Sequence, residues 1–176
     1  MRITVTLGSD AEQFAGRIAA FPAKARQAMA EGLNAGGDLE RTDVRRDVKV
    51  QTGARRYGAI KERTATKRAS PGNLVYTIVG TGKGMPIREF PVSASTRGPV
   101  TARPWGVVHA FARSFRTSTK GLLRARRGTA RFPIRALYGP SIAKEIVRDQ
   151  TAAHFETRAG PRVQQAVVKR LGRLLP

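Results

Sequence analysis

Apolar and polar residues alternate at the start of the chain and then change to a helical spacing. Ile3, Val5 and Leu7 alternate with polar residues, which predicts a short half-buried strand. Ser9 and Glu12 have the spacing of a helix capping box. Apolar residues then recur every three or four positions and predict one face of a long N-terminal helix. These residues are Phe14, Ile18, Phe21, Ala25, Met29 and Leu33.

Pro22 lies inside this helical pattern. Proline lacks a backbone donor and its ring clashes with the preceding turn. We therefore expect either a kink near Pro22 or a second helix with Pro22 in its first turn. The apolar pattern continues to about Val44.

A basic zone follows over residues 41–70, where ten Lys and Arg residues face only three acidic ones. The sequence VKVQTG at residues 48–53 is predicted to be extended. From there to Ser70-Pro71-Gly72 the turn-forming residues indicate a mobile loop. We accordingly predict a basic loop or arm at about residues 45–72.

Short strands are predicted in the middle of the chain. Residues 73–80 (NLVYTIVG) are β-branched or aromatic and bounded by turn residues, which is typical of a strand. Further strands are predicted at Ile87–Phe90, Val100–Arg103 and Val107–Phe115. Another strand, Arg131–Leu137, follows a basic loop or hairpin and turns through Gly139-Pro140.

Two helices are predicted to close the chain. The first starts at Pro140 or Ser141, and the second has Pro161 at its start. The apolar stripe of the second helix is expected to pack on the sheet of the same chain, with docking of another subunit as the alternative. It comprises Val163, Val167, Leu171 and Leu174. A long N-terminal helix, an antiparallel sheet of several short strands and two C-terminal helices define an α+β fold in a single domain, residues 1–176.

The overall composition narrows the class of protein. The chain has 176 residues, 40% of them apolar, which is enough for a real core. It has no cysteine, which excludes disulfides and thiolate metal sites and fits a reducing cytoplasm. No apolar run approaches the ~20 residues that span a bilayer, and the first residues do not have the pattern of a signal peptide.

Positive charge is concentrated in one part of the chain. The formal net charge is +21, and residues 90–144 contain no Asp or Glu. This acid-free interval contributes +11, from Arg97, Arg103, Arg113, Arg116, Lys120, Arg124, Arg126, Arg127, Arg131, Arg135 and Lys144. Because an ordinary surface mixes both signs, we predict a polyanionic or acidic partner for this region rather than a merely solvated loop.

Seven residues are the candidates for the charged surface: Arg113, Arg116, Lys120, Arg124, Arg126, Arg127 and Arg131. They would bind DNA phosphates with release of counterions. Alternatively, they would pair with carboxylates of an acidic protein. Both interpretations stay open, and no motif for reading a base sequence is present.

Catalytic chemistry is not expected. His109 and His154 have no neighbouring ligands at metal spacing and are interpreted as structural or solvated residues. The segment Gly80–Gly84 resembles a phosphate loop in composition, but a strand is predicted after it, so it is interpreted as a turn. We therefore predict no enzyme activity, no metal and no cofactor.

The carboxylates do not form an obvious Mg²⁺ site. Asp38, Glu40, Asp43 and Asp47 lie on one predicted helix among arginines, so pairing within the helix is the simplest interpretation. Glu89 is isolated in the sequence. Trp105 is interpreted as a core or interface anchor, with a base-stacking platform as the alternative.

Several segments together resemble a known family. They are residues 85–90 (MPIREF), Gly98 to Gly106, Ala110-Phe111 and residues 132–142 (FPIRALYGPSI). This succession resembles the prophage minor tail protein Z family, the tail-completion proteins of long-tailed phages. The resemblance covers most of the chain and is weakest at residues 41–70. It implies packing or turn roles for Trp105, Phe132, Pro133, Leu137, Tyr138, Gly139, Pro140 and Ser141.

The resemblance also implies a function. It predicts a virion protein, made in the host cytoplasm, at the head-proximal end of the tail. Copies would form a ring, six-fold or related, that joins the tail tube and tail terminator to the head connector around the DNA path. The alternative from another class is a free nucleic-acid-binding protein without sequence specificity. Membrane association is not expected.

Overall fold

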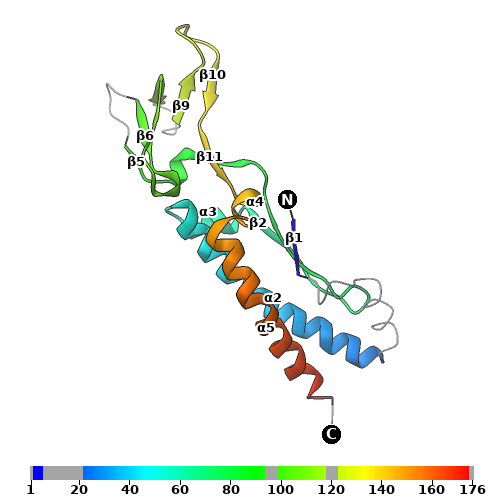
Figure 1. Cartoon of the computed structure of the whole chain (residues 1–176). Coiled ribbons are helices and arrows are strands. Elements are labelled where there is room, and N and C mark those ends of the chain that lie inside the picture. Colours follow the sequence, from blue (N-terminus) through cyan, green and yellow to red (C-terminus); the bar gives the residue numbers. More distant parts are fainter. Residues whose placement is uncertain (1, 6–21, 94–98, 118–122, 175–176) are drawn as a thin grey trace.

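The computed structural model describes residues 2–5, 22–93, 99–117 and 123–174 and has an α+β fold, as predicted. The molecule is elongated (Figure 1). Two long helices and the sheet of β1 (Arg2–Val5) and β2 (Thr64–Lys67) lie towards one end. Further short antiparallel strands, β5 (Val92–Ser93), β6 (Val100–Ala102), β9 (Leu123–Arg126) and β10 (Ile134–Ala136), lie at the other end. Two elements of the N-terminal prediction, the capping box and the first half of the apolar stripe, lie outside the described residues.

Helix α2, Ala23–Thr52, is the longest element. Pro22 is its N-cap, so the alternative of a helix starting at the proline agrees with the structure. The helix ends at Gly53, whose left-handed conformation (φ 71°) lets its N–H donate to the carbonyls of Lys49 and Val50.

The predicted extended segment at residues 48–53 is wrong, because α2 continues through it to Thr52. Val44, Val48 and Thr52 are spaced four residues apart and are fully buried on one face of the helix. Burial of this face outweighs the weak helix preference of valine. The Thr52 hydroxyl also donates to the Val48 carbonyl at 2.7 Å.

The predicted arm at residues 45–72 is likewise replaced by packed structure. After α2 come helix α3, Tyr57–Lys61, and strand β2, Thr64–Lys67. Arg45 is buried and its guanidinium donates to the Thr64 carbonyl at 3.0 Å. Asn34 forms a two-way bridge to the backbone of Ala69. These contacts hold the basic segment against α2.

A three-stranded antiparallel sheet packs on α2 in the order β1-β3-β2. Strand β1 is Arg2–Val5 and strand β3 is Tyr76–Gly80, both at predicted positions. Tyr76 is buried and its hydroxyl donates to Asp38 Oδ1 at 2.7 Å. Burial and this hydrogen bond raise the pKa of Tyr76 to about 12, so the phenol stays protonated at neutral pH.

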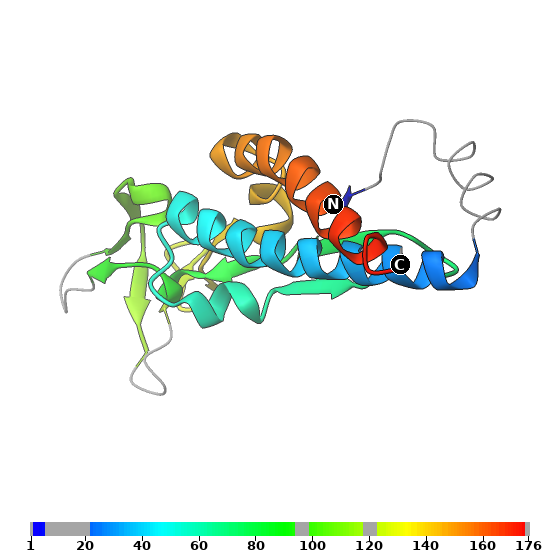
Figure 2. The ribbon, with the colours of Figure 1, turned by 90° about the horizontal axis from the view of Figure 1, so that it is seen from below.

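The other face of α2 carries the C-terminal helix, so that α2 lies between α5 and the strands (Figure 2). Helix α4 is Ile142–Glu145 and helix α5 is Asp149–Leu171. The break between them falls at Arg148 and Asp149 (φ 51°), not at Pro161 as predicted. Pro161 lies inside α5, preceded by Gly160, which has no Cβ to clash with the proline ring.

The apolar stripe of α5 packs on α2, not on the sheet. Val163 and Val167 lie against Gly36 and Gly32, so the two backbones approach closely. A Cβ built on Gly32 would lie 2.6 Å from the Cα of Val167. The helix contact therefore depends on the missing side chains of these glycines.

The remaining strands lie beyond the C-terminal end of α2. Strands β4 and β11 pair with each other, and strands β5–β10 form two sheets in the orders β5-β6-β7 and β10-β9-β8. We call strands β5–β10 with their connections, residues 92–136, the β module. The bounds are β4 Gly84–Pro86, β5 Val92–Ser93, β6 Val100–Ala102, β7 His109–Phe111, β8 Ser114–Arg116, β9 Leu123–Arg126, β10 Ile134–Ala136 and β11 Tyr138–Ser141.

Three predictions in this region need correction. Residues Ile87–Glu89 form a 3-10 helix (η1) instead of a strand. The predicted strand Val107–Phe115 is divided into β7 and β8 by a turn at Arg113, which has φ 56°. Gly139 and Pro140 do not turn the chain but lie in β11. The strands at Val100 and Ile134 and the basic β9–β10 hairpin are confirmed.

Candidate polyanion-binding surface

Strand β9 presents its arginines on one face of the β module. Leu123 and Ala125 are buried, whereas Arg124 is half-buried and Arg126 is exposed. This alternation follows from the two-residue period of a strand. Ala125 packs into the main core, so that the guanidinium groups of β9 are directed to the opposite face.

Aromatic rings support two of the candidate arginines. Arg126 lies over the ring of Phe115 on β8, 5.0 Å from its centre. Arg131 lies over Phe132, 5.8 Å from the ring centre. Cation–π contacts of this kind add stability of about 0.5–1 kcal/mol at exposed sites and restrict the guanidinium without neutralising it.

The structure places several of the predicted residues in or beside the sheet β10-β9-β8, but not all on one face. Arg124 and Arg126 share a face, whereas Arg116 pairs with Leu123 and therefore lies on the other face of the sheet. Arg113 and Arg126 are neighbours, because the Arg126 N–H donates to the Arg113 carbonyl at 3.1 Å. Arg116 is exposed at the end of β8. Arg127 and Arg131 belong to the hairpin that joins β9 to β10, and Lys120 lies outside the described residues.

Many arginines outside the β module form ion pairs with acids, and this is the main contrast with the β module. Within the described part of the chain, none of the ion pairs involves a Lys or Arg of residues 90–144. The ion pairs of the described residues lie in the helices, in β2 and its flanks, or at η1. The positive charge of the β module is therefore uncompensated by carboxylates of the described residues.

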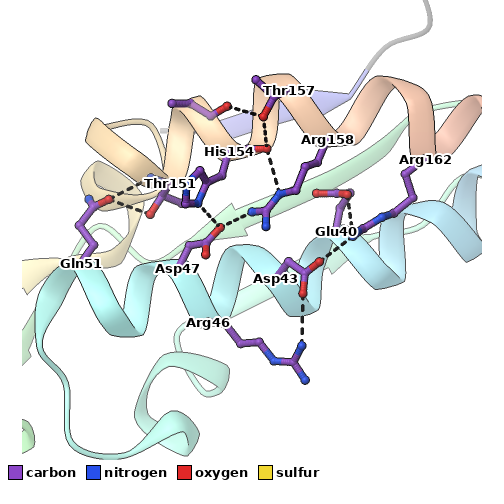
Figure 3. A network of polar contacts seen from close by, with 11 residues as sticks. Glu40, Asp43, Arg46, Asp47, Gln51, Thr151, His154, Thr157, Arg158 and Arg162 are labelled. Carbon is purple, nitrogen blue, oxygen red and sulfur yellow. Dashed lines mark hydrogen bonds and ion pairs between the residues drawn. The ribbon is translucent and has the colours of Figure 1, made fainter.

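A ladder of ion pairs joins α2 to α5 (Figure 3). Arg162 Nη1 lies 2.8 Å from Glu40 Oε1 and 2.6 Å from Asp43 Oδ2. One turn further along, Arg158 and His154 both pair with Asp47. The prediction that these carboxylates pair only within their own helix is thus incomplete, since pairs such as Arg46–Asp43 account for only part of the network.

Burial and hydrogen bonding shift the pKa values of two acids in this ladder in opposite directions. Glu40 is fully buried, and the loss of hydration raises its pKa, an effect that nearby Arg162 opposes. For Asp43 the hydrogen bond from Arg162 dominates and lowers the pKa. The same bond raises the pKa of Arg162.

A polar cluster caps this interface at the end near α4 (Figure 3). Gln51 Oε1 accepts hydrogen bonds from the backbone N–H and the hydroxyl of Thr151, and Gln51 Nε2 donates to Glu145 Oε2 at 2.8 Å. These groups satisfy one another, so the cluster holds α5 on α2 and leaves no free reactive group there.

The motif residues of the family resemblance have mixed environments. Leu137 and Pro140 are buried, and Gly139 packs against Phe90, where a Cβ would lie 2.9 Å from the ring. By contrast, Trp105 (44% exposed), Phe132 (65%) and Tyr138 (48%) are largely exposed. Ser141 donates to the Gly82 carbonyl at 2.9 Å, and Pro133 follows a cis peptide bond.

Trp105 is therefore not a core anchor in the isolated chain. It has a left-handed backbone (φ 55°) in the 3-10 turn η2, Pro104–Gly106. Its ring packs edge-to-face on the His109 ring, with 6.1 Å between the ring centres. Val107 and Val108 beside it are also exposed. An exposed apolar segment of this kind is typical of an interaction surface.

Other site chemistries find little support in the described residues. No group of three or more His, Cys, Asp or Glu side chains there is arranged to hold a metal ion. None of the described helices is long and apolar enough to cross a membrane. Comparison of the chain with known protein families, with curated proteins and with solved structures found no match.

Proposed function

We propose that this chain is a structural subunit of a phage virion, at the head-proximal end of the tail. Copies form a ring, six-fold or related, around the DNA path and connect the tail tube and terminator to the head connector. The protein is made in the host cytoplasm and acts by geometry, without catalysis. The family resemblance of residues 85–142 supports this assignment.

The observation that carries the proposal is the separation of charge in the fold. Many arginines of the helices form ion pairs with acids, whereas the β module exposes arginines that have no carboxylate within residues 90–144. Such a surface gains free energy when it meets a polyanion, because counterions are released. In a ring, this surface suits the DNA channel.

The elongated shape supports different roles for the two ends of the molecule. The helices α2 and α5 pack against each other, and the β module lies at the other end (Figure 1). The exposed Trp105 and Val107 lie in the β module and offer apolar contact to a neighbouring subunit. Contacts between neighbouring subunits of the proposed ring would thus form beside the exposed arginines of the β module.

Charge removal on the β module tests the proposal. The variant R116Q/R126Q/R127Q removes three arginines of the module, and the control R46Q/K67Q/K169Q removes three exposed charges from the rest of the chain. Binding of a labelled duplex of about 20 base pairs is measured by fluorescence anisotropy as a function of salt. We expect the β module variant to bind at least ~10-fold more weakly at about 0.1 M salt, with a salt slope smaller by about 0.9 per lost phosphate contact. An equal effect of the control would contradict the proposal.

A free nucleic-acid-binding protein is the second candidate, favoured by the Arg126–Phe115 pair, which resembles a stacking surface. Sedimentation velocity with and without DNA separates the two functions. A ring subunit binds DNA weakly as a monomer and more tightly when it is assembled. Tight binding by a monomer or dimer would support the second candidate.

A further inference from the structure

Glu89 forms the base of a second charged site, outside the acid-free interval. Its side chain is only 6% exposed, in the 3-10 helix η1. Arg56, at the start of α3, binds both carboxylate oxygens: Nε lies 3.1 Å from Oε2, and Nη2 lies 3.1 Å from Oε1 and 3.0 Å from Oε2. Glu89, which is isolated in the sequence from other acids, thus pairs with an arginine 33 residues away.

The two-point contact fixes the orientation of the Arg56 guanidinium. Nε and Nη2 are used by Glu89, while Nη1 donates to no group among the described residues. The Arg56 side chain is nevertheless 66% exposed. The buried Glu89 carboxylate thus holds the exposed Arg56 guanidinium in place and leaves its Nη1 group available to another acceptor.

Two further arginines surround the same carboxylate. The Arg55 N–H donates to the Glu89 carbonyl at 2.8 Å, which places Arg55 beside η1. Arg88 reaches Glu89 only loosely, with 3.7 Å between Nε and Oε1. Arg55, Arg56, Arg88 and Glu89 together line an open hollow of about 390 Å³. Three guanidinium groups against one carboxylate leave a net charge of +2 at this hollow.

The composition of the hollow indicates which kind of anion it takes. A docking site for a protein side chain combines an apolar centre with a polar rim. Here the four described lining residues are all charged, and three of them are arginines. A phosphate group, which can accept several N–H donors at once, fits such a set better than an acidic peptide does.

We propose that the hollow lined by Arg55, Arg56 and Arg88 over Glu89 is a phosphate-binding site that takes a backbone phosphate of DNA. The choice of DNA as the ligand rests on the proposed function. The hollow would add one contact of fixed geometry to the diffuse positive charge of the β module. Arg103 of the module donates its N–H to the Pro91 carbonyl and its own carbonyl faces Gly53, so the two basic regions adjoin. DNA that contacts the β module would reach this hollow at its edge.

The test leaves the Arg56–Glu89 pair intact, because a buried unpaired Glu89 would destabilise the fold. The variant R55Q/R88Q removes the two outer arginines, and the control R46Q/K169Q removes two exposed charges from the helices. Duplex binding is measured as above for both variants. We expect R55Q/R88Q to weaken binding at least ~5-fold and to lower the salt slope by about 0.9, corresponding to one phosphate. The control is expected to stay within about two-fold of wild type, and equal effects of both variants would overturn the proposal.

A second measurement observes the site directly. Inorganic phosphate is titrated into the full chain, and the side-chain Nε–H signals of arginine are followed by NMR. Saturable shifts of the Arg55, Arg56 and Arg88 signals in wild type, with loss of the Arg56 shift in R55Q/R88Q, are the expected result. Signals that do not respond would overturn the proposal. So would displacement of phosphate by poly-glutamate in preference to duplex DNA, because an acidic protein would then be the ligand.

The two proposals fail in different ways. If R116Q/R126Q/R127Q weakens DNA binding and R55Q/R88Q does not, the hollow is only a structural ion pair and the proposed function stands. If only R55Q/R88Q weakens binding, the hollow binds phosphate and the β module does not face DNA.

Discussion

Replacement of Gly32 by alanine tests whether the α2–α5 contact depends on a missing side chain. The new Cβ would lie 2.6 Å from the Cα and 2.9 Å from the N of Val167, both backbone atoms that cannot rotate away. The helices would therefore have to separate. Overpacking of this kind costs about 1–3 kcal/mol, and alanine recovers about 0.5–1 kcal/mol through its better helix preference. We expect a net loss of about 0–2.5 kcal/mol in the free energy of unfolding.

Gly58→Ala is the matched control, because Gly58 lies in α3 and a Cβ added there would meet no atom within 4 Å. This substitution should leave stability unchanged or raise it by up to about 1 kcal/mol. Both variants are measured by urea unfolding followed by circular dichroism, with wild type alongside. If Gly32→Ala is as stable as Gly58→Ala, the close approach of α2 and α5 is refuted.

Three further predictions concern the polar ladder between α2 and α5. Burial raises the pKa of Glu40, so the charged form of this side chain costs stability as pH rises above the ordinary pKa of Glu. Glu40→Gln should therefore stabilise the protein at neutral pH by on the order of 1 kcal/mol. A lower free energy of unfolding in urea would contradict this prediction. The hydrogen bond from Arg162 lowers the pKa of Asp43. The charged Asp43 therefore contributes stability above the ordinary pKa of Asp, and this stability is lost as pH falls through the lowered pKa. Asp43→Asn should reduce the fall of the thermal unfolding midpoint that is measured from about pH 6 to 2. Gln51→Ala leaves the buried Thr151 hydroxyl unsatisfied and should cost about 1–3 kcal/mol in urea unfolding, whereas an unchanged midpoint would argue against the cluster.

The fold class and several strands could be predicted from local patterns. The β-branched and aromatic run located β3, and a basic loop or hairpin was expected ahead of the strand that contains Ile134. The exposure of the acid-free interval also followed from composition, because charges without carboxylates nearby remain in solvent. These features depend on residues that are close in the sequence.

The errors arose where distant parts of the chain decide the local structure. Helix α2 continues to Thr52 because its last turns are buried, and α5 continues through Pro161 because both of its halves pack or pair with α2. Arg56 and Glu89 are 33 residues apart, and Arg162 and Asp43 are 119 apart. No spacing rule connects such partners, so these sites could be seen only in the folded chain.

The most direct test of the proposed virion role is a cryo-electron microscopy map of the tail–head junction of the phage particle in which this chain is proposed to lie. We predict a ring of this protein between tail tube and head connector, with Arg126 and its neighbours on the β module within about 10 Å of DNA density, the screening length at about 0.1 M salt. Absence of the chain from the particle, or a ring whose β module faces away from the channel, would contradict this prediction.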